Sequence, residues 1–253
     1  HRPDKLKDGS PLAARPQGTD DTGCLVQAVG ERRPLDDHLL VAFSGAELFR
    51  RQGLAQVDLT TGLTCAWNPT VAEVRSLALR DSTLLIGGYF TFVSGQPRRY
   101  AAEVSLTTGA ATPWNPNANE AVVCVAASER AVYVGGGFTG LGSQWQARMN
   151  VAAFDATTGE VTDWNPSPDG YGVYALAVAR GHVYVGGIFS RIGGQYRYGI
   201  AEVDTGTGAA TDWDPAGGGW VLAFTVAGDI LYVGGDFTSM GGLARTRLAS
   251  FDL

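Results

Sequence analysis

The chain has 253 residues, of which 45% are hydrophobic, and a formal net charge of −6. This length allows a sizeable core in one large domain or two smaller ones. The 19 lysines and arginines argue against nucleic acid or an anionic membrane as the main partner. Because no apolar run approaches the roughly 18 residues of a membrane span, membrane insertion is not expected either.

Residues 8–16 carry a glycine and a proline seven positions apart, and the same spacing ends each complete unit that follows. Residues 24–69 form the first unit, in which Ala42-Phe43 stands where later copies have Gly-Gly. Further units occupy 71–116, 118–166, 167–215 and a shorter 216–253. The glycine pairs repeat at intervals of 48, 51 and 48 residues, beginning at Gly87, Gly135, Gly186 and Gly234.

Each complete unit contains four short apolar runs separated by turn residues, which predicts four antiparallel strands, a to d. In the fourth unit these runs are Val173–Val178, His182–Gly187, Ile200–Val203 and Ala209–Trp213. The turn between strands c and d ends on a glycine, which supplies the positive φ of a tight hairpin. An acid that begins most of these turns is expected to cap them, namely Asp58, Asp155, Asp204 and Asp252.

A four-stranded unit of this length, with a Gly-Gly strand and an outer tryptophan, is typical of a β-propeller blade. The last unit stops at the end of strand c, and residues 8–16 match the missing strand d, with Ala14 in place of the tryptophan. We therefore predict an all-β, five-bladed propeller forming a single domain, residues 1–253. Its ring is closed by the N-terminal segment, which supplies the outer strand of the last blade. The blades are 24–69, 71–116, 118–166, 167–215, and 216–253 with 8–16.

Two repeated residues are expected to pack neighbouring blades together. The glycine pair lets inner strands approach closely, and a broad indole fills the wider gap near the rim. The tryptophans concerned are Trp67, Trp114, Trp164 and Trp213.

The pattern Tyr-Val-Gly-Gly-x-Phe-Thr, then Gly-Gly, Arg, an apolar-Ala strand, Asp-x-x-Thr-Gly and Trp-Asn-Pro, resembles the bacterial delta-60 β-propeller repeat. The resemblance covers residues 71–253 well and 24–69 weakly. It implies a module of a large secreted or surface protein, which displays or binds something outside the cell. It carries no catalytic motif. We therefore expect a bacterial, extracellular or cell-surface location.

The b–c segments and d–a connections share one end of the predicted ring, here called the long-loop face. Variable loops on a rigid scaffold are the usual place for binding residues. Aromatic rings that stack on sugars, beside amides that bind hydroxyls, would make this face lectin-like and carbohydrate-binding. Alternatively, the rings plug grooves between loops, or they mediate a protein–protein interaction. The aromatic residues are Tyr100, Trp145, Tyr171, Tyr196, Tyr198 and Trp220, with Gln96, Gln144, Gln146, Asn117, Asn119 and Asp169 as polar neighbours.

One arginine recurs at the start of strand c, at Arg51, Arg98, Arg148, Arg197 and Arg245. Five guanidinium groups on a ring could bind an acidic ligand. Their strict repetition favours a structural role instead, in which each bonds loop carbonyls or a carboxylate of its own or a neighbouring blade.

An enzyme is not favoured. Some five-bladed propellers are glycoside hydrolases with carboxylates in the central cleft, but the inner strands are almost wholly apolar here. The acids that stand at their entrances are Asp20, Asp21, Glu73 and Glu120. Cys24, Cys65 and Cys124 have no metal or redox spacing, so we expect no cofactor and no metal. The sequence thus predicts a binding module for a glycan or a partner protein. The alternative is a structural subunit of a larger surface complex.

Overall fold

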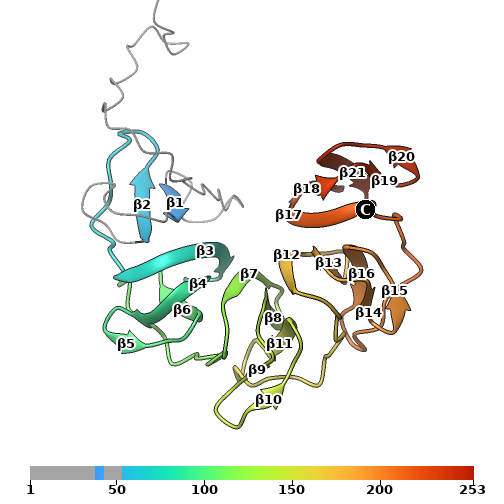
Figure 1. The fold of residues 1–253 in the computed structure, drawn as a ribbon. Coiled ribbons are helices and arrows are strands. Elements are labelled where there is room, and N and C mark those ends of the chain that lie inside the picture. The colour runs from blue at the N-terminus through green and yellow to red at the C-terminus, as the bar shows by residue number, and fades with distance from the viewer. Residues whose placement is uncertain (1–37, 43–52) are drawn as a thin grey trace, which may run out of the picture.

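The computed structural model describes residues 38–42 and 53–253 (Figure 1). Every regular element in these residues is a β-strand, and the strands pair antiparallel within separate small sheets. The all-β class predicted from the sequence is therefore confirmed. In Figure 1 the sheets follow one another in chain order along an arc, with one strand of each of the four larger sheets facing a common centre.

Four larger sheets run outward from an inner strand through a middle strand to a third strand. The inner strands are β3 (Val71–Arg80), β7 (Val122–Ala127), β12 (Gly172–Ala179) and β17 (Gly219–Ala227). The middle strands are β4 (Thr83–Val93), β8 (Ala131–Gly136), β13 (His182–Ile188) and β18 (Ile230–Phe237). The third strands are β6 (Ala101–Ser105), β11 (Val151–Asp155), β16 (Ile200–Asp204) and β21 (Leu248–Asp252). In the first unit, β1 (His38–Ala42) pairs with β2 (Leu54–Asp58).

The b–c segments contain short strands that the sequence did not predict. A two-residue strand, β5 (Gln96–Pro97), pairs with the end of β4. Three hairpins are built from strands of two residues each. They pair β9 (Gly140–Leu141) with β10 (Gln146–Ala147), β14 (Arg191–Ile192) with β15 (Gln195–Tyr196), and β19 (Ser239–Met240) with β20 (Leu243–Ala244).

The predicted strand d is much shorter than expected. In the fourth unit it pairs with strand c at one bridge, between Val203 and Ala210, and Thr211 N–H donates to the Glu202 carbonyl at 3.0 Å. The Thr211 hydroxyl then accepts the Trp213 N–H at 3.2 Å, which diverts that donor from the ladder. A proline two residues later has no N–H to continue the pairing. The other units repeat this bridge at Val57–Thr64, Val104–Ala111 and Phe154–Val161.

The two glycines of each pair have different packing roles. A Cβ added at Gly135 would lie 2.7 Å from Val173 Cγ1, in the inner strand of the next unit. A Cβ added at Gly136 would lie 2.0 Å from the Ala121 carbonyl oxygen of its own unit, beside a register shift in the β7–β8 pairing. The first glycine therefore permits close approach of neighbouring units, as predicted. The second accommodates a β-bulge within the sheet. The sequence prediction that both glycines allow neighbouring units to approach is therefore wrong for the second glycine.

The repeated tryptophans lie between successive units. Trp164 Nε1 donates to the Asp204 carbonyl of the next unit at 2.9 Å, and Trp67 Nε1 donates to the Ser105 carbonyl at the same distance. Trp213 packs edge-on against Tyr184 of its own unit and against Phe251 of the next. Buried clusters of apolar side chains accordingly span each pair of neighbouring units.

The last sheet exposes the face that each preceding sheet packs against its successor. Leu248 is 67% exposed, whereas the residues at its register position in the third and fourth units, Val151 and Ile200, are 0% and 1% exposed. Tyr232 is exposed in the same way, while its counterpart Tyr184 is buried. The arc is not closed by the residues that the structure describes. The segment 8–16 and the predicted inner strand 24–29 of the first unit lie outside them.

Candidate functional site

The antiparallel strand order places the b–c hairpins at one end of the sheets and the a–b and c–d turns at the other. In the fourth unit the hairpin β14–β15 turns through Gly193 and Gly194, whose φ values are +57° and +82°. Two positive φ angles in a two-residue loop match the twist of the flanking strands, which is why glycine is needed at both positions. The hairpin holds Tyr196 at its end, and Tyr198 follows two residues later.

A cavity of about 310 Å³ opens at this hairpin. Tyr196 and Tyr198 form one wall, and Asp214, Ala216 and Gly217 of the connection to the fifth unit form the other. Tyr196 and Tyr198 are 62% and 38% exposed. The cavity therefore combines aromatic residues with a carboxylate, on two segments of the same unit.

Arg197 holds the two walls together. Its Nη1 donates to the Tyr196 carbonyl at 2.8 Å, and its Nη2 donates to the Thr211 carbonyl at 2.7 Å. Nη1 also lies 3.4 Å from Asp214 Oδ2. The other carboxylate oxygen, Asp214 Oδ1, accepts the Ala216 N–H at 2.9 Å. Asp214 is thus fixed in orientation while remaining open to solvent, as a pre-organised acceptor must be.

The same arginine contacts recur in neighbouring units. Arg98 and Arg148 each donate one Nη2 hydrogen bond to the carbonyl fourteen residues later, at Thr112 and Thr162, and one Nη1 bond to the preceding carbonyl. The guanidinium groups are therefore engaged by loop carbonyls, which is the structural role that the repetition favours. Among the described residues, the Arg245 side chain has no such hydrogen-bond partner. Arg51 lies outside the described residues.

The other predicted aromatic residues do not line the tyrosine cavity. Trp145 covers Gly140 in its own loop, where an added Cβ would lie 2.6 Å from the indole. Tyr171 is strongly exposed beside β12, and Trp220 is partly exposed on β17. Tyr100 is half-buried and packs against a core cluster, with φ at +64°. Of the six residues, the cavity brings together only Tyr196 and Tyr198.

Two of the predicted polar neighbours hold the loops rather than face a ligand. Asp169 Oδ1 accepts the N–H groups of Ser190 and Arg191 at 2.6 and 2.8 Å. Asn119 Oδ1 accepts those of Thr139 and Gly140 at 3.0 and 3.1 Å. Both side chains fix the start of a b–c hairpin. Gln96 and Gln146 lie exposed on β5 and β10, Gln144 is exposed in the loop before β10, and Asn117 is exposed with φ at +47°.

Of the four acids predicted at the entrances of the inner strands, two lie in the described residues. Glu73 pairs with Arg75 at 2.6 Å, and Glu120 is exposed. Asp20 and Asp21 lie outside the described residues, and so does Cys24. Within residues 38–42 and 53–253, no group of three or more His, Cys, Asp or Glu residues could hold a metal ion. The same part of the chain contains no helix long and apolar enough to cross a membrane.

Sequence reasoning missed Asp214 as a site residue. The signal was present, because the unit-ending motif reads Trp-Asn-Pro in three units and Trp-Asp-Pro only here. The tyrosine pair is likewise confined to this unit, since the third has Ala147 and Met149 at the same offsets from its arginine. A site of this composition therefore occurs once along the repeats, not once per unit.

Neither a protein family nor a curated protein matches the chain. Among solved structures, it is similar to two computationally designed proteins. The crystal structure of designed Ika8 matches with a TM-score of 0.52 and 15% identity, over 83% of this chain and 57% of that one. Designed Ika4 matches with a TM-score of 0.46 and 16% identity, over 71% and 91% of the two chains. At such identity the Ika8 likeness concerns the fold alone.

Proposed function

We propose that the chain is a five-bladed β-propeller of the delta-60 type. We further propose that it acts outside the cell as a non-catalytic, glycan-binding module. The blade count is supported by five sequence units and by the sheets that four of them form around one centre. The close approach of the middle-strand glycines Gly87, Gly135 and Gly186 to the inner strand of the next unit supports a ring rather than a flat stack of sheets.

Closure of the ring by this chain's own N-terminal segment is part of the proposal. Three observations support it. The last sheet exposes the face that its predecessors bury. Gly234 keeps the repeat's glycine, although no side chain of a neighbouring sheet in the described residues lies within 4 Å of an added Cβ. Arg245 keeps the repeat's arginine, although its side chain makes no hydrogen bond to another described residue. Residue 12 matches Thr112 in the segment comparison, so its carbonyl would be the acceptor.

The observation that supports glycan binding is the cavity between Tyr196, Tyr198 and Asp214. Tyrosine rings stack on the apolar face of a sugar, and an oriented carboxylate accepts hydrogen bonds from two adjacent hydroxyls. The Arg197 clamp pre-organises both walls, which reduces the entropy lost on binding. The site contains one fixed carboxylate rather than a pair flanking a cleft, so it favours binding over glycoside hydrolysis.

A glycan array followed by titration with the strongest hit tests this function. Tyr196→Ala removes a stacking ring and should weaken binding about tenfold, equivalent to about 1.4 kcal/mol, whereas Tyr196→Phe should weaken it less. Trp145→Ala is the matched control, since it removes another exposed aromatic side chain from the same face but outside the cavity. If no sugar binds, or if only the control variant loses binding, the glycan proposal is wrong.

The second candidate is a structural subunit of a larger surface complex. The exposed apolar residues of the last sheet favour it, because a partner protein could cover Leu222, Tyr232 and Leu248 if the first blade does not. Removal of residues 1–23 separates the two possibilities. Under closure the truncated chain loses stability, while under assembly its stability is unchanged.

A further inference from the structure

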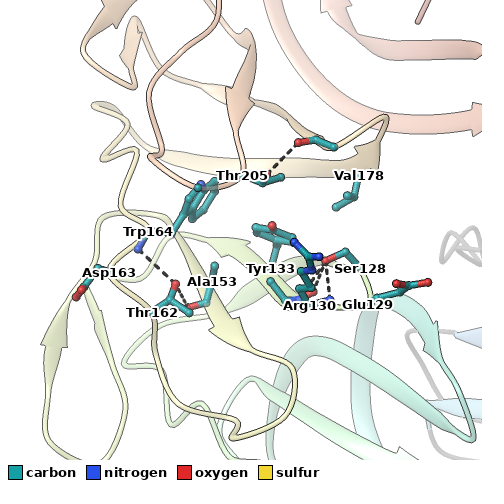
Figure 2. A pocket seen from close by; sticks show the side chains of 13 residues that line it. Ser128, Glu129, Arg130, Tyr133, Ala153, Thr162, Asp163, Trp164, Val178 and Thr205 are labelled. Carbon is teal, nitrogen blue, oxygen red and sulfur yellow. Dashed lines mark hydrogen bonds between the residues drawn. The ribbon is translucent and has the colours of Figure 1, made fainter.

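A second cavity, of about 650 Å³, lies between the third and fourth units at the tight-turn end of the sheets (Figure 2). Its aromatic residues, Tyr133 and Trp164, are 2% and 4% exposed and pack edge-on against each other, so their rings belong to the core. In the tyrosine cavity, by contrast, Tyr196 and Tyr198 both have exposed surface. Of these two cavities, the smaller one is therefore the place where an aromatic ring can stack on a ligand.

Asp214 is the position at which the tyrosine cavity departs from the other units. Asn115 Oδ1 accepts the Asn117 N–H at 3.2 Å, just as Asp214 Oδ1 accepts the Ala216 N–H at 2.9 Å. An amide therefore forms the same turn, and the loop does not require a carboxylate. The residues equivalent to Asp214 in the first three units are Asn68, Asn115 and Asn165.

The arginine beneath the loop does not require the carboxylate either. Arg98 and Arg148 donate to the two corresponding backbone carbonyls, and neither forms an ion pair with another described residue. Arg197 Nη1 lies 3.4 Å from Asp214 Oδ2, which is a long contact, and it already donates to the Tyr196 carbonyl at 2.8 Å. The frame of the loop is thus complete without the negative charge of Asp214.

The carboxylate is accessible to a ligand, whereas the guanidinium group is not. The Asp214 side chain is 43% exposed and lines the cavity, while that of Arg197 is 11% exposed and does not line it. The tyrosine pair and the carboxylate also occur together, since none of the five sequence units has one without the other. The second unit, for example, has Pro97 and Arg99 in place of the tyrosines.

A carboxylate and an amide select different ligand groups. A hydroxyl group both donates and accepts, so either an asparagine or an aspartate can bind it. A protonated amino group has three donors and no acceptor, and its hydrogen bonds to a carboxylate are charge-assisted. Tyrosine faces attract a cation as well. The exchange of asparagine for aspartate beside two tyrosines therefore favours a ligand that carries an ammonium group next to an apolar ring face.

We propose that the tyrosine cavity selects amino sugars with a free amino group, such as the glucosamine units of a deacetylated glycan. This inference rests on the proposed glycan function and narrows its ligand class. The sugar ring stacks on the tyrosines, while its ammonium group and the neighbouring hydroxyl donate to Asp214. A volume of about 310 Å³ is at the lower end for ligand pockets, so the cavity holds a single sugar unit.

Calorimetric titration of the full chain with three β-1,4-linked trisaccharides tests this selection. The trimers consist of glucosamine, N-acetylglucosamine or glucose, so they differ only in the C2 substituent, which is an ammonium, acetamide or hydroxyl group. At about pH 6, where a primary amine is protonated, the glucosamine trimer should bind at least about tenfold more tightly than the other two. n-Butylammonium carries the charge without a sugar ring and should bind at least about tenfold more weakly than the glucosamine trimer.

Asp214→Asn restores the asparagine of the other units, which is compatible with the loop. It should weaken binding of the glucosamine trimer about tenfold and change binding of the glucose trimer by less than about threefold. Asp212→Asn is the matched control, because it removes an exposed carboxylate of the same segment that does not line the cavity. It should leave the affinity for the glucosamine trimer unchanged. Equal losses in the two variants would indicate general attraction to an acidic chain and would overturn the proposal.

The outcomes separate this inference from the glycan function itself. If the glucose trimer binds as tightly as the glucosamine trimer, the amino-sugar inference is wrong and glycan binding stands. The same holds if the glycan array finds a ligand but the glucosamine trimer does not bind. If n-butylammonium binds as tightly as the glucosamine trimer, the cavity recognises an alkylammonium group and the amino-sugar inference is wrong. If no sugar binds in either experiment, both proposals fail.

Discussion

Alanine substitution at the first glycine of a pair measures whether the ring is closed. In Gly186→Ala, the new Cβ would lie 2.6 Å from Val221 Cγ1 and 2.9 Å from Phe224 Cζ. Carbon atoms pack at about 3.5–4.0 Å, so both neighbours must move. Such overpacking costs about 1–3 kcal/mol. The lower backbone entropy of alanine in the unfolded chain returns about 0.5–1 kcal/mol. We expect a net loss of about 1–2 kcal/mol.

Gly234→Ala is the informative variant. In the described residues its Cβ would meet only Ala223 Cβ at 3.7 Å and the Arg247 carbonyl at 4.0 Å, which are ordinary contacts. In an open arc the substitution should therefore stabilise the fold by about 0.5–1 kcal/mol. In a closed ring, Gly234 faces the inner strand of the first blade as Gly186 faces β17. Closure thus predicts a loss of about 1–2 kcal/mol for this variant as well.

Equilibrium unfolding in urea measures the free energy of unfolding of the wild type, Gly186→Ala and Gly234→Ala. The slope of this free energy against urea concentration is compared among the three proteins. For a chain of this size, 1 kcal/mol corresponds to about 2–4 °C in Tm, so the two outcomes differ by several degrees. A Gly234→Ala protein as stable as the wild type would refute closure. A neutral Gly186→Ala would refute the packing argument itself.

Three further predictions concern single side chains. Trp164→Phe should lower the free energy of unfolding by about 1 kcal/mol more than Trp114→Phe does, as measured by chemical unfolding. The reason is that Trp164 Nε1 donates to the Asp204 carbonyl, whereas Trp114 Nε1 is buried without a partner. Equal losses in the two variants would contradict this. Hydrogen bonds from the Thr158 and Thr157 amides lower the pKa of Asp155, so its stabilisation is full above the unfolded pKa of about 3.9 and is lost as the pH falls through the lower folded value. The stability difference between wild type and Asp155→Asn should therefore shrink in the acid range, and a difference constant with pH would exclude the hydrogen-bond explanation. Burial raises the pKa of the Cys124 thiol, so a thiol reagent at pH 8 should label this residue only on unfolding, as peptide mass spectrometry would reveal.

The repeated parts of the fold could be predicted from the sequence because each relies on local chemistry. Apolar runs became strands a to c, and Asp58, Asp155 and Asp204 cap the c–d turns through hydrogen bonds to the second and third amides that follow. Strand d was overestimated because the Thr211 hydroxyl competes for a ladder donor, which hydrophobic patterning does not register. The second glycine of each pair was misassigned because a bulge depends on pairing register.

The sites were harder to predict because they depend on residues brought together by pairing. Tyr196 and Tyr198 were identified from their residue type, but Asp214 was not, since it looked like a variant of a structural asparagine.

The b–c hairpins are held at both ends by residues outside the hairpin tip. In the fourth unit, Asp169 and the Pro166 carbonyl hold the start of the hairpin, because they accept hydrogen bonds from the Ser190, Arg191 and Gly193 amides. Arg197 holds its end. The third unit repeats these fastenings with Asn119, Pro116 and Arg148. The residues between the fastenings can therefore be exchanged without altering the frame. Transplanting the 191–198 hairpin into the third unit, together with Asn165→Asp, should create a second copy of the tyrosine cavity. The chain would then serve as a scaffold whose recognition loops can be diversified one blade at a time.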